Sequence, residues 1–166
     1  FWGIRGGGGN FGVVTSFEFD LHEVGPEVLG GMIVYPYEDA AEVLRFHRDF
    51  TAEAPDELCC YAAIMTAPEA PFLPAEVHGT MVVALVPVYS GAVDDGEEVL
   101  RPLREFGDPI ADVIQPMPFV AVQQLVDAEY EPGLRNYWKT ELVDPLPDEV
   151  IDILVERSAP LPSPQT

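Results

Sequence analysis

The residues of this sequence whose types and spacing could do chemistry stand at its start, where a run of glycines leads into an apolar segment. Residues 5–15 read RGGGGNFGVVT. Without side chains, Gly6 to Gly9 can adopt positive φ and bring backbone amide hydrogens within bonding range of a phosphate or an aromatic ring system. Such a loop suits contact with a nucleotide cofactor. A mobile loop or a tight entry into a strand accounts for the same glycines, so the glycines alone leave both interpretations open.

The pattern around the glycines and along the rest of the chain excludes several common sites. No helix is predicted after the glycine run, as a dinucleotide-binding βαβ unit requires, and no Gly-Lys-Ser/Thr ends it. No Gly-x-Ser-x-Gly elbow occurs, so hydrolase chemistry is unsupported. The histidines at positions 22, 47 and 78 have spacings that form no metal cluster, and we expect no metal site.

The whole stretch FWGIRGGGGNFGVVTSFEF, residues 1–19, resembles the signature that closes the FAD-binding domain of berberine bridge enzyme-like oxidases. These belong to the vanillyl-alcohol oxidase, or PCMH-type, flavoproteins. LHEVGP, AAEVLR, PFLP, YSG and YWKT are similar to the same family in the same order, so the resemblance spans nearly the whole chain. It implies an FAD-dependent oxidoreductase that oxidises a small organic substrate, an alcohol, sugar or amine, by hydride transfer to the flavin.

The resemblance also implies which residues line the FAD. Backbone amides and carbonyls of the glycine-rich segment would make the contacts, with the asparagine and the phenylalanine shaping the turn. The cofactor-binding residues expected in this way are Gly8, Gly9, Asn10, Phe11, Gly12, Val13 and Val14.

Several parts of the family pattern have no counterpart in this chain. They are the upstream diphosphate-binding loop, the flavin-linking histidine and cysteine, and the downstream tail that bears a tyrosine. Cys59 and Cys60 follow the glycine motif, whereas the linking cysteine precedes it, and we expect them to be small buried residues of a strand. The resemblance therefore implies an internal fragment of a flavin enzyme, whose catalytic base lies outside the sequence.

A candidate substrate pocket involves the late segment of the chain. Alternation predicts that Tyr137, Lys139 and Glu141 share one face of a strand, and in the family the corresponding face can look toward substrate. Lys139 is the only lysine of the sequence, which suggests a specific role for it in the pocket. The alternative is that Lys139 pairs with one of the many surface carboxylates.

A second set of candidates lies on two earlier strands. Tyr61, Ile64 and Met65 on one strand could line the same pocket as Val88 and Tyr89 on another. Apolar and aromatic residues on strands are more often core. The residues that we assign to the substrate pocket are therefore Tyr61, Tyr137 and Lys139.

The elements that must position these residues follow from hydrophobic periodicity. Period-two alternation and apolar runs predict strands over residues 12–21, 29–35, 58–65, 81–89, 110–114 and 136–143. Phe17, Phe19 and Leu21 of the first strand should face a core. Helical spacing predicts helices over residues 39–50, 94–106, 119–126 and 148–157.

The order of these elements predicts an α+β fold. From residue 29 the chain reads β-α-β-β-α-β, the split pattern in which helices cover one face of an antiparallel sheet. Residues 58–65 and 81–89 should form a hairpin with a long loop, and the strand at 136–143 should extend the sheet. Residues 1–25 would be the last part of the FAD-binding domain, residues 26–159 the substrate-binding domain, and residues 160–166 a disordered or truncated end.

The charge of the chain is strongly acidic and limits its partners. The 166 residues include 29 acidic and 8 basic side chains, a formal net charge of −21. Nucleic acids and anionic membranes need a basic footprint and are excluded. Many carboxylates with a single lysine indicate a halophilic protein, although an ordinary acidic protein that gains solubility from its charge is the alternative.

Compartment and partners follow from what the sequence lacks. No apolar run is long enough to cross a bilayer, so we expect no membrane partner and a cytoplasmic location. The expected partner is a small-molecule substrate, with a homodimer as a possible assembly. The rival interpretation is a stand-alone, non-catalytic α+β binding module left by truncation, which would expose an apolar sheet face and tend to dimerise.

Overall fold

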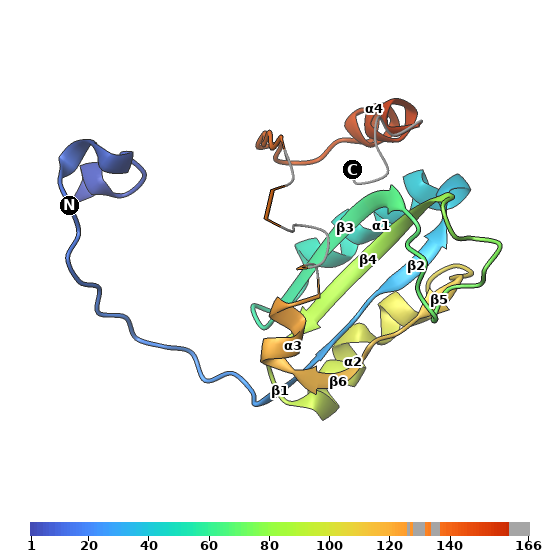
Figure 1. Ribbon diagram of the computed structural model, residues 1–166, viewed down its shortest axis with the longest axis horizontal. Helices are drawn as coiled ribbons and strands as arrows, with labels where there is room; N and C mark the ends of the chain where they lie inside the picture. Colours follow the sequence, from blue (N-terminus) through green and yellow to red (C-terminus); the bar gives the residue numbers. More distant parts are fainter. Residues whose placement is uncertain (126, 128–131, 134–136, 160–166) are drawn as a thin grey trace.

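The computed structural model describes residues 1–125, 127, 132–133 and 137–159. Within them, an antiparallel sheet of six strands forms the centre of the fold, and residues 1–24 extend away from it (Figure 1). The strands are β1 (Glu27–Gly30), β2 (Ile33–Pro36), β3 (Leu58–Thr66), β4 (Met81–Tyr89), β5 (Ala111–Asp112) and β6 (Gln115–Pro118).

Strand β4 organises the sheet. Along one side it pairs with β3 over the full length of both strands, from Leu58 opposite Tyr89 to Thr66 opposite Met81. Its other side is shared by β1 and β2, and β6 and β5 pair with these in turn. The sheet therefore has four rows, ordered β3, β4, β1 with β2, and β6 with β5. This is the order of the predicted split β-α-β-β-α-β pattern.

Two predicted strands differ from their expected bounds. The expected strand over residues 29–35 breaks between β1 and β2 at Gly31, whose φ is +152°. A Cβ at Gly31 would lie 2.4 Å from the carbonyl oxygen of Val113, so only glycine lets the two rows approach there. The expected strand over residues 110–114 is shortened to β5, and β6 begins only beyond it, at Gln115.

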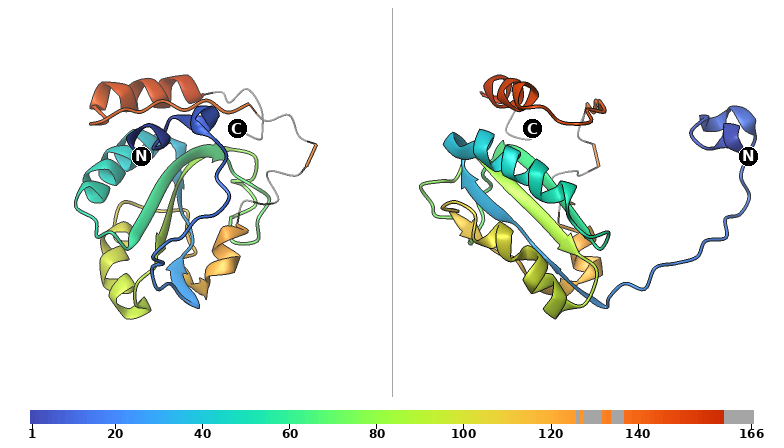
Figure 2. Two further views of the ribbon diagram at one scale, coloured as in Figure 1. Left: turned by 90° about the vertical axis from the view of Figure 1, so that its left-hand side faces the viewer. Right: turned by 180° about the vertical axis from the view of Figure 1, so that it is seen from behind.

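Two amphipathic helices cover one face of the sheet, which we call the helix face. They are α1 (Ala40–Ala52) and α2 (Val93–Arg104), and Figure 2 (left) shows them on the same side of the strands. Pro102 lies inside α2, and the helix ends two residues later. The core between helices and strands is formed by Leu29, Ile33, Tyr35, Ala40, Val43, Leu44, Val83, Leu85, Tyr89, Leu100, Leu103, Ile114 and Ile151.

The opposite face, which we call the second face, has lighter cover. The loop of residues 67–80 packs a smaller apolar cluster against one end of it, with Leu73 over Val34 and its neighbours. The short helix α3 (Phe119–Gln123) covers the other end, because a Cβ at Gly30 would contact Val122 at 3.6 Å. The prediction that helices cover one face of the sheet therefore holds for α1 and α2, whereas α3 lies on the opposite face.

A third layer lies over α1. Helix α4 (Asp148–Ser158) packs on it through Ile151, which is fully buried. Arg48 Nη1 lies 2.5 Å from Asp148 Oδ1, and Arg45 Nε lies 3.2 Å from Asp148 Oδ2. Figure 2 shows α4 stacked on the side of α1 that faces away from the strands. The predicted helix over residues 148–157 is confirmed.

Two predicted strands do not form. Residues 12–24 make no strand pairing, and Phe17, Phe19 and Leu21, expected in a core, are exposed, Phe17 by 72%. Alternation identifies the apolar side of a strand, but a strand also needs a neighbour to pair with. Residues 137–143 are also without strand, so the sheet is not extended there. Parts of three predictions lie outside the described residues. They are Val126 of the predicted helix, Asn136 of the predicted strand, and the predicted disordered or truncated end at residues 160–166.

Candidate functional site

The glycine-rich start forms a small loop closed on itself. It consists of two short 3-10 turns, η1 (Trp2–Ile4) and η2 (Gly8–Phe11). A Cβ at Gly7 would lie 2.3 Å from Cε2 of the Phe11 ring, so the ring packs directly on the Gly7 backbone. Asn10 Nδ2 donates a hydrogen bond to the Gly7 carbonyl oxygen at 3.0 Å. Asn10 and Phe11 thus shape the turn, as expected.

The next glycines present their backbone to the outside. A Cβ at Gly8, Gly9 or Gly12 would meet nothing within 4 Å. Gly8 and Gly12 have positive φ, 64° and 136°, which explains the absence of a side chain. Gly9 has neither positive φ nor a neighbour that excludes a Cβ. No contact within the described residues therefore requires glycine at this position.

The other two residues expected at the cofactor, Val13 and Val14, are exposed in the extended segment that follows. Figure 1 and both views of Figure 2 show this segment leading away from the sheet. The structure therefore keeps Gly8 to Gly12 in one loop and places Val13 and Val14 in the extended segment directly after it. It does not bring them to the expected substrate residues.

The second face holds the first expected substrate residue, Tyr61. Its side chain is 47% exposed on β3, opposite Val86 of β4. Cys59 and Ala63 stand two residues away on either side and point to the same face. They pair with Val88 and Ala84. Cys59, Ala63 and Val86 were not expected as neighbours of Tyr61, although the period of two along paired strands contains that information.

Strand parity separates the other pocket candidates. Met65 and Val88 are on the second face with Tyr61, since their register follows the same period of two. Ile64 and Tyr89 pack in the core of the helix face, and Tyr89 is only 6% exposed. The idea that Ile64 and Tyr89 share a pocket with Tyr61 is therefore wrong, because odd separations place side chains on opposite faces.

The late candidates lie in a segment without regular structure. Tyr137 is 89% exposed and Lys139 is exposed, and no strand aligns them with Glu141. The five described arginines beyond residue 40 each lie within 4.0 Å of a carboxylate, whereas Lys139 makes no such ion pair within the described residues. The surface ion pair considered for Lys139 is therefore not seen among the described residues, and its assignment to the substrate pocket stays a prediction.

The two cysteines differ although they are neighbours. Cys59 is exposed on the second face, which corrects the expectation that both are buried. Cys60 packs against the core of the helix face, and burial raises the pKa of its thiol to about 12. His47 of α1 lies 3.0 Å from the Cys60 carbonyl oxygen through Nε2. A thiol with such a pKa stays protonated at neutral pH and is no nucleophile.

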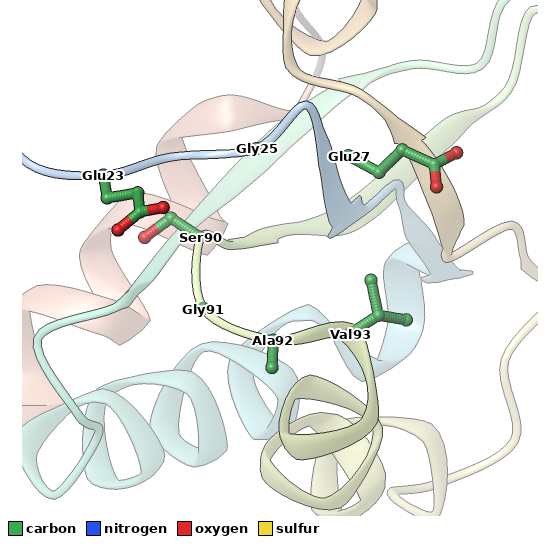
Figure 3. A pocket seen from close by; sticks show the side chains of 7 residues that line it. All are labelled: Glu23, Gly25, Glu27, Ser90, Gly91, Ala92 and Val93. Atoms are coloured by element: carbon green, nitrogen blue, oxygen red, sulfur yellow. The ribbon is translucent and has the colours of Figure 1, made fainter.

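Two shallow cavities open on the helix side and edge of the sheet. The larger, of about 320 Å³, is lined by Ser90, Gly91, Ala92 and Val93 before and at the start of α2 and by Glu23, Gly25 and Glu27 (Figure 3). Glu23 points toward Ser90 in this view, so a carboxylate lies beside the segment that precedes α2. The second, of about 210 Å³, contains Tyr35 and Asp39. Neither cavity includes an expected site residue.

Two further features of the chain concern metal binding and membranes. Within the described ranges, no group of three histidine, cysteine or acidic side chains is arranged to hold a metal ion. None of the helices seen in the same ranges combines the length and apolarity needed to cross a bilayer.

Comparison with known proteins places the chain among relatives that are flavin-linked oxidoreductases. It is 32% identical over 158 residues to an FAD-linked oxidoreductase of Dictyostelium discoideum, an alignment that covers 93% of this chain and 32% of the relative. It is 30% identical over 129 residues to the FAD-linked oxidoreductase aurO of Gibberella zeae, covering 76% of this chain and 24% of the relative. No protein-family model matches the chain.

A third relative has a named substrate. The chain is 29% identical over 143 residues to the (R)-6-hydroxynicotine oxidase of Paenarthrobacter nicotinovorans, covering 83% of this chain and 29% of the relative. The chain thus spans between 24% and 32% of the length of these three relatives. The names of the relatives support the oxidoreductase interpretation and FAD as the cofactor of the group, and none supports the binding-module alternative.

Proposed function

We propose that this chain is part of an FAD-dependent oxidoreductase of the berberine bridge enzyme-like, PCMH-type group. In this proposal residues 1–25 complete the FAD-binding domain, and residues 26–159 form the domain that covers the substrate. The intact enzyme oxidises a small organic substrate by hydride transfer. The observation that carries the proposal is the similarity to FAD-linked oxidoreductases over 93% of the chain.

The fit of FAD to the chain rests on the glycine loop. Gly8, Gly9 and Gly12 leave space for a molecule to approach the backbone from outside, and Gly9 has no reason within the described structure to be a glycine. Backbone amides in such a loop can bind a phosphate or the edge of a flavin ring. FAD, when bound, supplies the acceptor for two electrons and a hydrogen. The loop's own contribution is to bind and orient the cofactor.

The second face of the sheet is the surface that we assign to the substrate. Its covering elements leave Cys59 and Tyr61 exposed, whereas the helix face is packed against α1 and α2. A sheet closed over a flavin would hold the substrate in a fixed geometry and exclude water. Tyr61 would contact the substrate there, and Tyr137 and Lys139 would approach from the connecting segment. The proton of the substrate would pass to a base outside this chain.

Anaerobic reduction of the flavin tests the proposed function. The native gene product is purified from its source, and its flavin content and absorbance spectrum are recorded. Addition of alcohols, amines and sugars without oxygen should bleach the flavin absorbance with at least one class. A native protein without flavin would contradict the proposal, and so would a flavin that no substrate class reduces.

We also propose that the protein is adapted to a salt-rich cytoplasm. The formal charge of −21 destabilises the compact state through self-repulsion, which salt screens. Potassium chloride should therefore raise the melting temperature of the chain steeply between low and molar concentrations. A melting temperature that does not depend on potassium chloride would favour an ordinary acidic protein.

A further inference from the structure

The loop between β3 and β4, residues 67–80, is a self-contained unit, which we call the lid. Its two ends meet at a neck, where the Ala67 amide donates to the Thr80 carbonyl oxygen at 2.8 Å. The Gly79 amide donates to the Ala67 carbonyl oxygen at 2.9 Å. Within the described structure, every hydrogen bond of residues 67–80 begins and ends inside this range. A compact surface loop with close ends and its own internal packing is an Ω-loop, a class that is frequently functional.

The side chain of His78 braces the lid from within. Its Nε2 lies 3.1 Å from the carbonyl oxygen of Leu73 and 3.3 Å from that of Ala70. Carbonyl oxygens only accept hydrogen bonds, so Nε2 must carry the hydrogen and donate it to both. The brace joins the returning arm of the lid to the turn that carries Leu73, and it keeps that turn in place.

The lid meets the sheet through apolar side chains. Leu73 is 5% exposed and packs with Val34 of β2 and Ala84 of β4, which lie opposite each other at one end of the second face. Figure 1 shows the lid as the green loop beside β2 and β5. No carboxylate of the lid forms an ion pair with a described residue. The lid can therefore leave the sheet without breaking a hydrogen bond or an ion pair of the described structure.

The neck has the backbone features of a hinge. A hinge consists of a few positions at the end of a moving element that absorb a change of φ and ψ. Gly79 has a φ of +75°, and a Cβ at this position would meet nothing within 4 Å. Its backbone can therefore rotate without a clash. Pro68 stands on the other arm, where its ring fixes φ, so the rotation is concentrated at Gly79.

We infer that the lid opens as one body about its neck while the sheet stays folded. Opening withdraws Leu73 and uncovers the apolar strip of Val34 and Ala84, which closing buries again. Opening costs only apolar contacts, whereas the helix face cannot be exposed without removing α1 and α2 from the larger core. This end of the second face thus has a covered and an uncovered state. The inference concerns the fold alone and does not depend on the proposed function.

Alkylation of buried thiols measures the opening in the intact gene product. Val34→Cys places a thiol under the lid, where Val34 is 1% exposed, and Val83→Cys places one in the core of the helix face, where Val83 is 0% exposed. Iodoacetamide is added under native conditions at fixed pH and potassium chloride, and peptide mass mapping gives each rate. We expect Val34→Cys to react about tenfold faster or more, since lid opening is a local event. Equal rates would overturn the inference.

Substitutions within the lid assign the opening to the lid. Leu73→Ala removes the contact with the sheet and should raise the alkylation rate of Val34→Cys by a further factor of about ten or more. The rate of Val83→Cys should stay within about threefold, because its core is intact. An unchanged rate at Val34→Cys would overturn the inference. So would an equal increase at both thiols, since the sheet would then open together with the lid.

Variants of His78 test the brace. His78→Ala should raise the alkylation rate of Val34→Cys several-fold, and His78→Gln should restore it, because the glutamine amide also donates hydrogen bonds. Glu76→Gln is the matched control, since Glu76 is exposed in the lid and makes no ion pair with a described residue. If Val34→Cys lowers the urea midpoint, Ala84→Cys replaces it, because Ala84 is 0% exposed and lies opposite Val34 under the lid. The same rates for His78→Ala and Glu76→Gln would contradict the role of the brace.

Discussion

The two faces of the sheet differ in what covers them and in the residues that they carry. On the helix face Ile33, Leu85 and Leu100 are fully buried. On the second face a loop and a short helix cover the two ends, and Cys59 and Tyr61 of β3 remain exposed. The comparison teaches that the strand period separates two sets of residues: one set forms the larger core under α1 and α2, and the other combines a smaller buried cluster with the exposed Cys59 and Tyr61.

Strand β3 shows the separation within a single element. Cys60 and Ile64 contact the core of the helix face, while Cys59 and Tyr61 point the other way. Substitutions one residue apart on β3 should therefore have different consequences. Those toward the helices should change stability, and those toward the second face should change ligand binding.

The largest effect is expected from a pair of substitutions on β4. Leu85→Ala on the helix face should lower the free energy of unfolding by about 3 kcal/mol, because it removes a fully buried side chain and leaves a cavity. Val88→Ala on the second face should cost about 1 kcal/mol, since Val88 is only partly buried. Urea unfolding of the chain at constant, high potassium chloride measures both. Equal losses would break the distinction between the faces.

A smaller but sharper comparison uses the adjacent cysteines. Iodoacetamide at pH 8 should alkylate Cys59 in the folded chain and leave Cys60 unmodified until urea is added, as peptide mass mapping will show. Cys59→Ser should abolish labelling of the folded chain. Modification of Cys60 in the native state at the rate of Cys59 would contradict the assigned faces.

The raised pKa of Cys60 also predicts a dependence of stability on alkaline pH. Burial raises this pKa from 9.0 to about 12, so the unfolded thiol loses its proton at lower pH than the folded one. The stabilisation is complete below pH 9.0 and is lost as pH rises from there toward about 12. Burial raises the pKa of Tyr35 to about 12 as well, which adds to the loss. Cys60→Ala should flatten the slope, measured by urea unfolding between pH 8 and pH 11.

Much of the fold could be predicted from the sequence because its signals are local. The helical spacing that ends near Phe50 and the apolar runs of β3 and β4 need no knowledge of distant residues. The break at Gly31 was missed because its cause is the approach of Val113, about eighty positions away in sequence. The strand expected over residues 12–21 does not form, because alternation identifies an apolar side but provides no neighbouring strand to pair with.

The candidate site could be predicted in part. Tyr61 stood out as an aromatic residue on a predicted strand, and the structure places it half-exposed on the second face. Ile64 was grouped with it wrongly, although a separation of three residues on a strand already indicates the opposite face. The exposure of Tyr61 depends on which distant segments pack over the second face, and no local pattern contains that information.

The smallest expected effect concerns α4, which lies over α1 on the helix side only. Arg48 first, and then Arg45, stabilise the Asp148 carboxylate by hydrogen bonds and hold its pKa below the ordinary value. A lowered folded pKa means that this contribution is present above the unfolded pKa of about 4 and is lost as pH falls through the folded value. Asp148→Asn removes the carboxylate charge, so this contribution to stability should be lost at neutral pH as well.

Hydrogen exchange followed by mass spectrometry distinguishes a local from a global effect of Asp148→Asn. Amides of α4 should exchange several-fold faster, while those of β4 stay protected, because the pair is at the surface and joins only the outer layer. Glu156→Gln is the matched control, since Glu156 is exposed on the same helix with Arg157 at 3.9 Å. Faster exchange in β4 would mean that α4 supports the whole sheet. The helix face would then depend on its third layer as much as on α1 and α2.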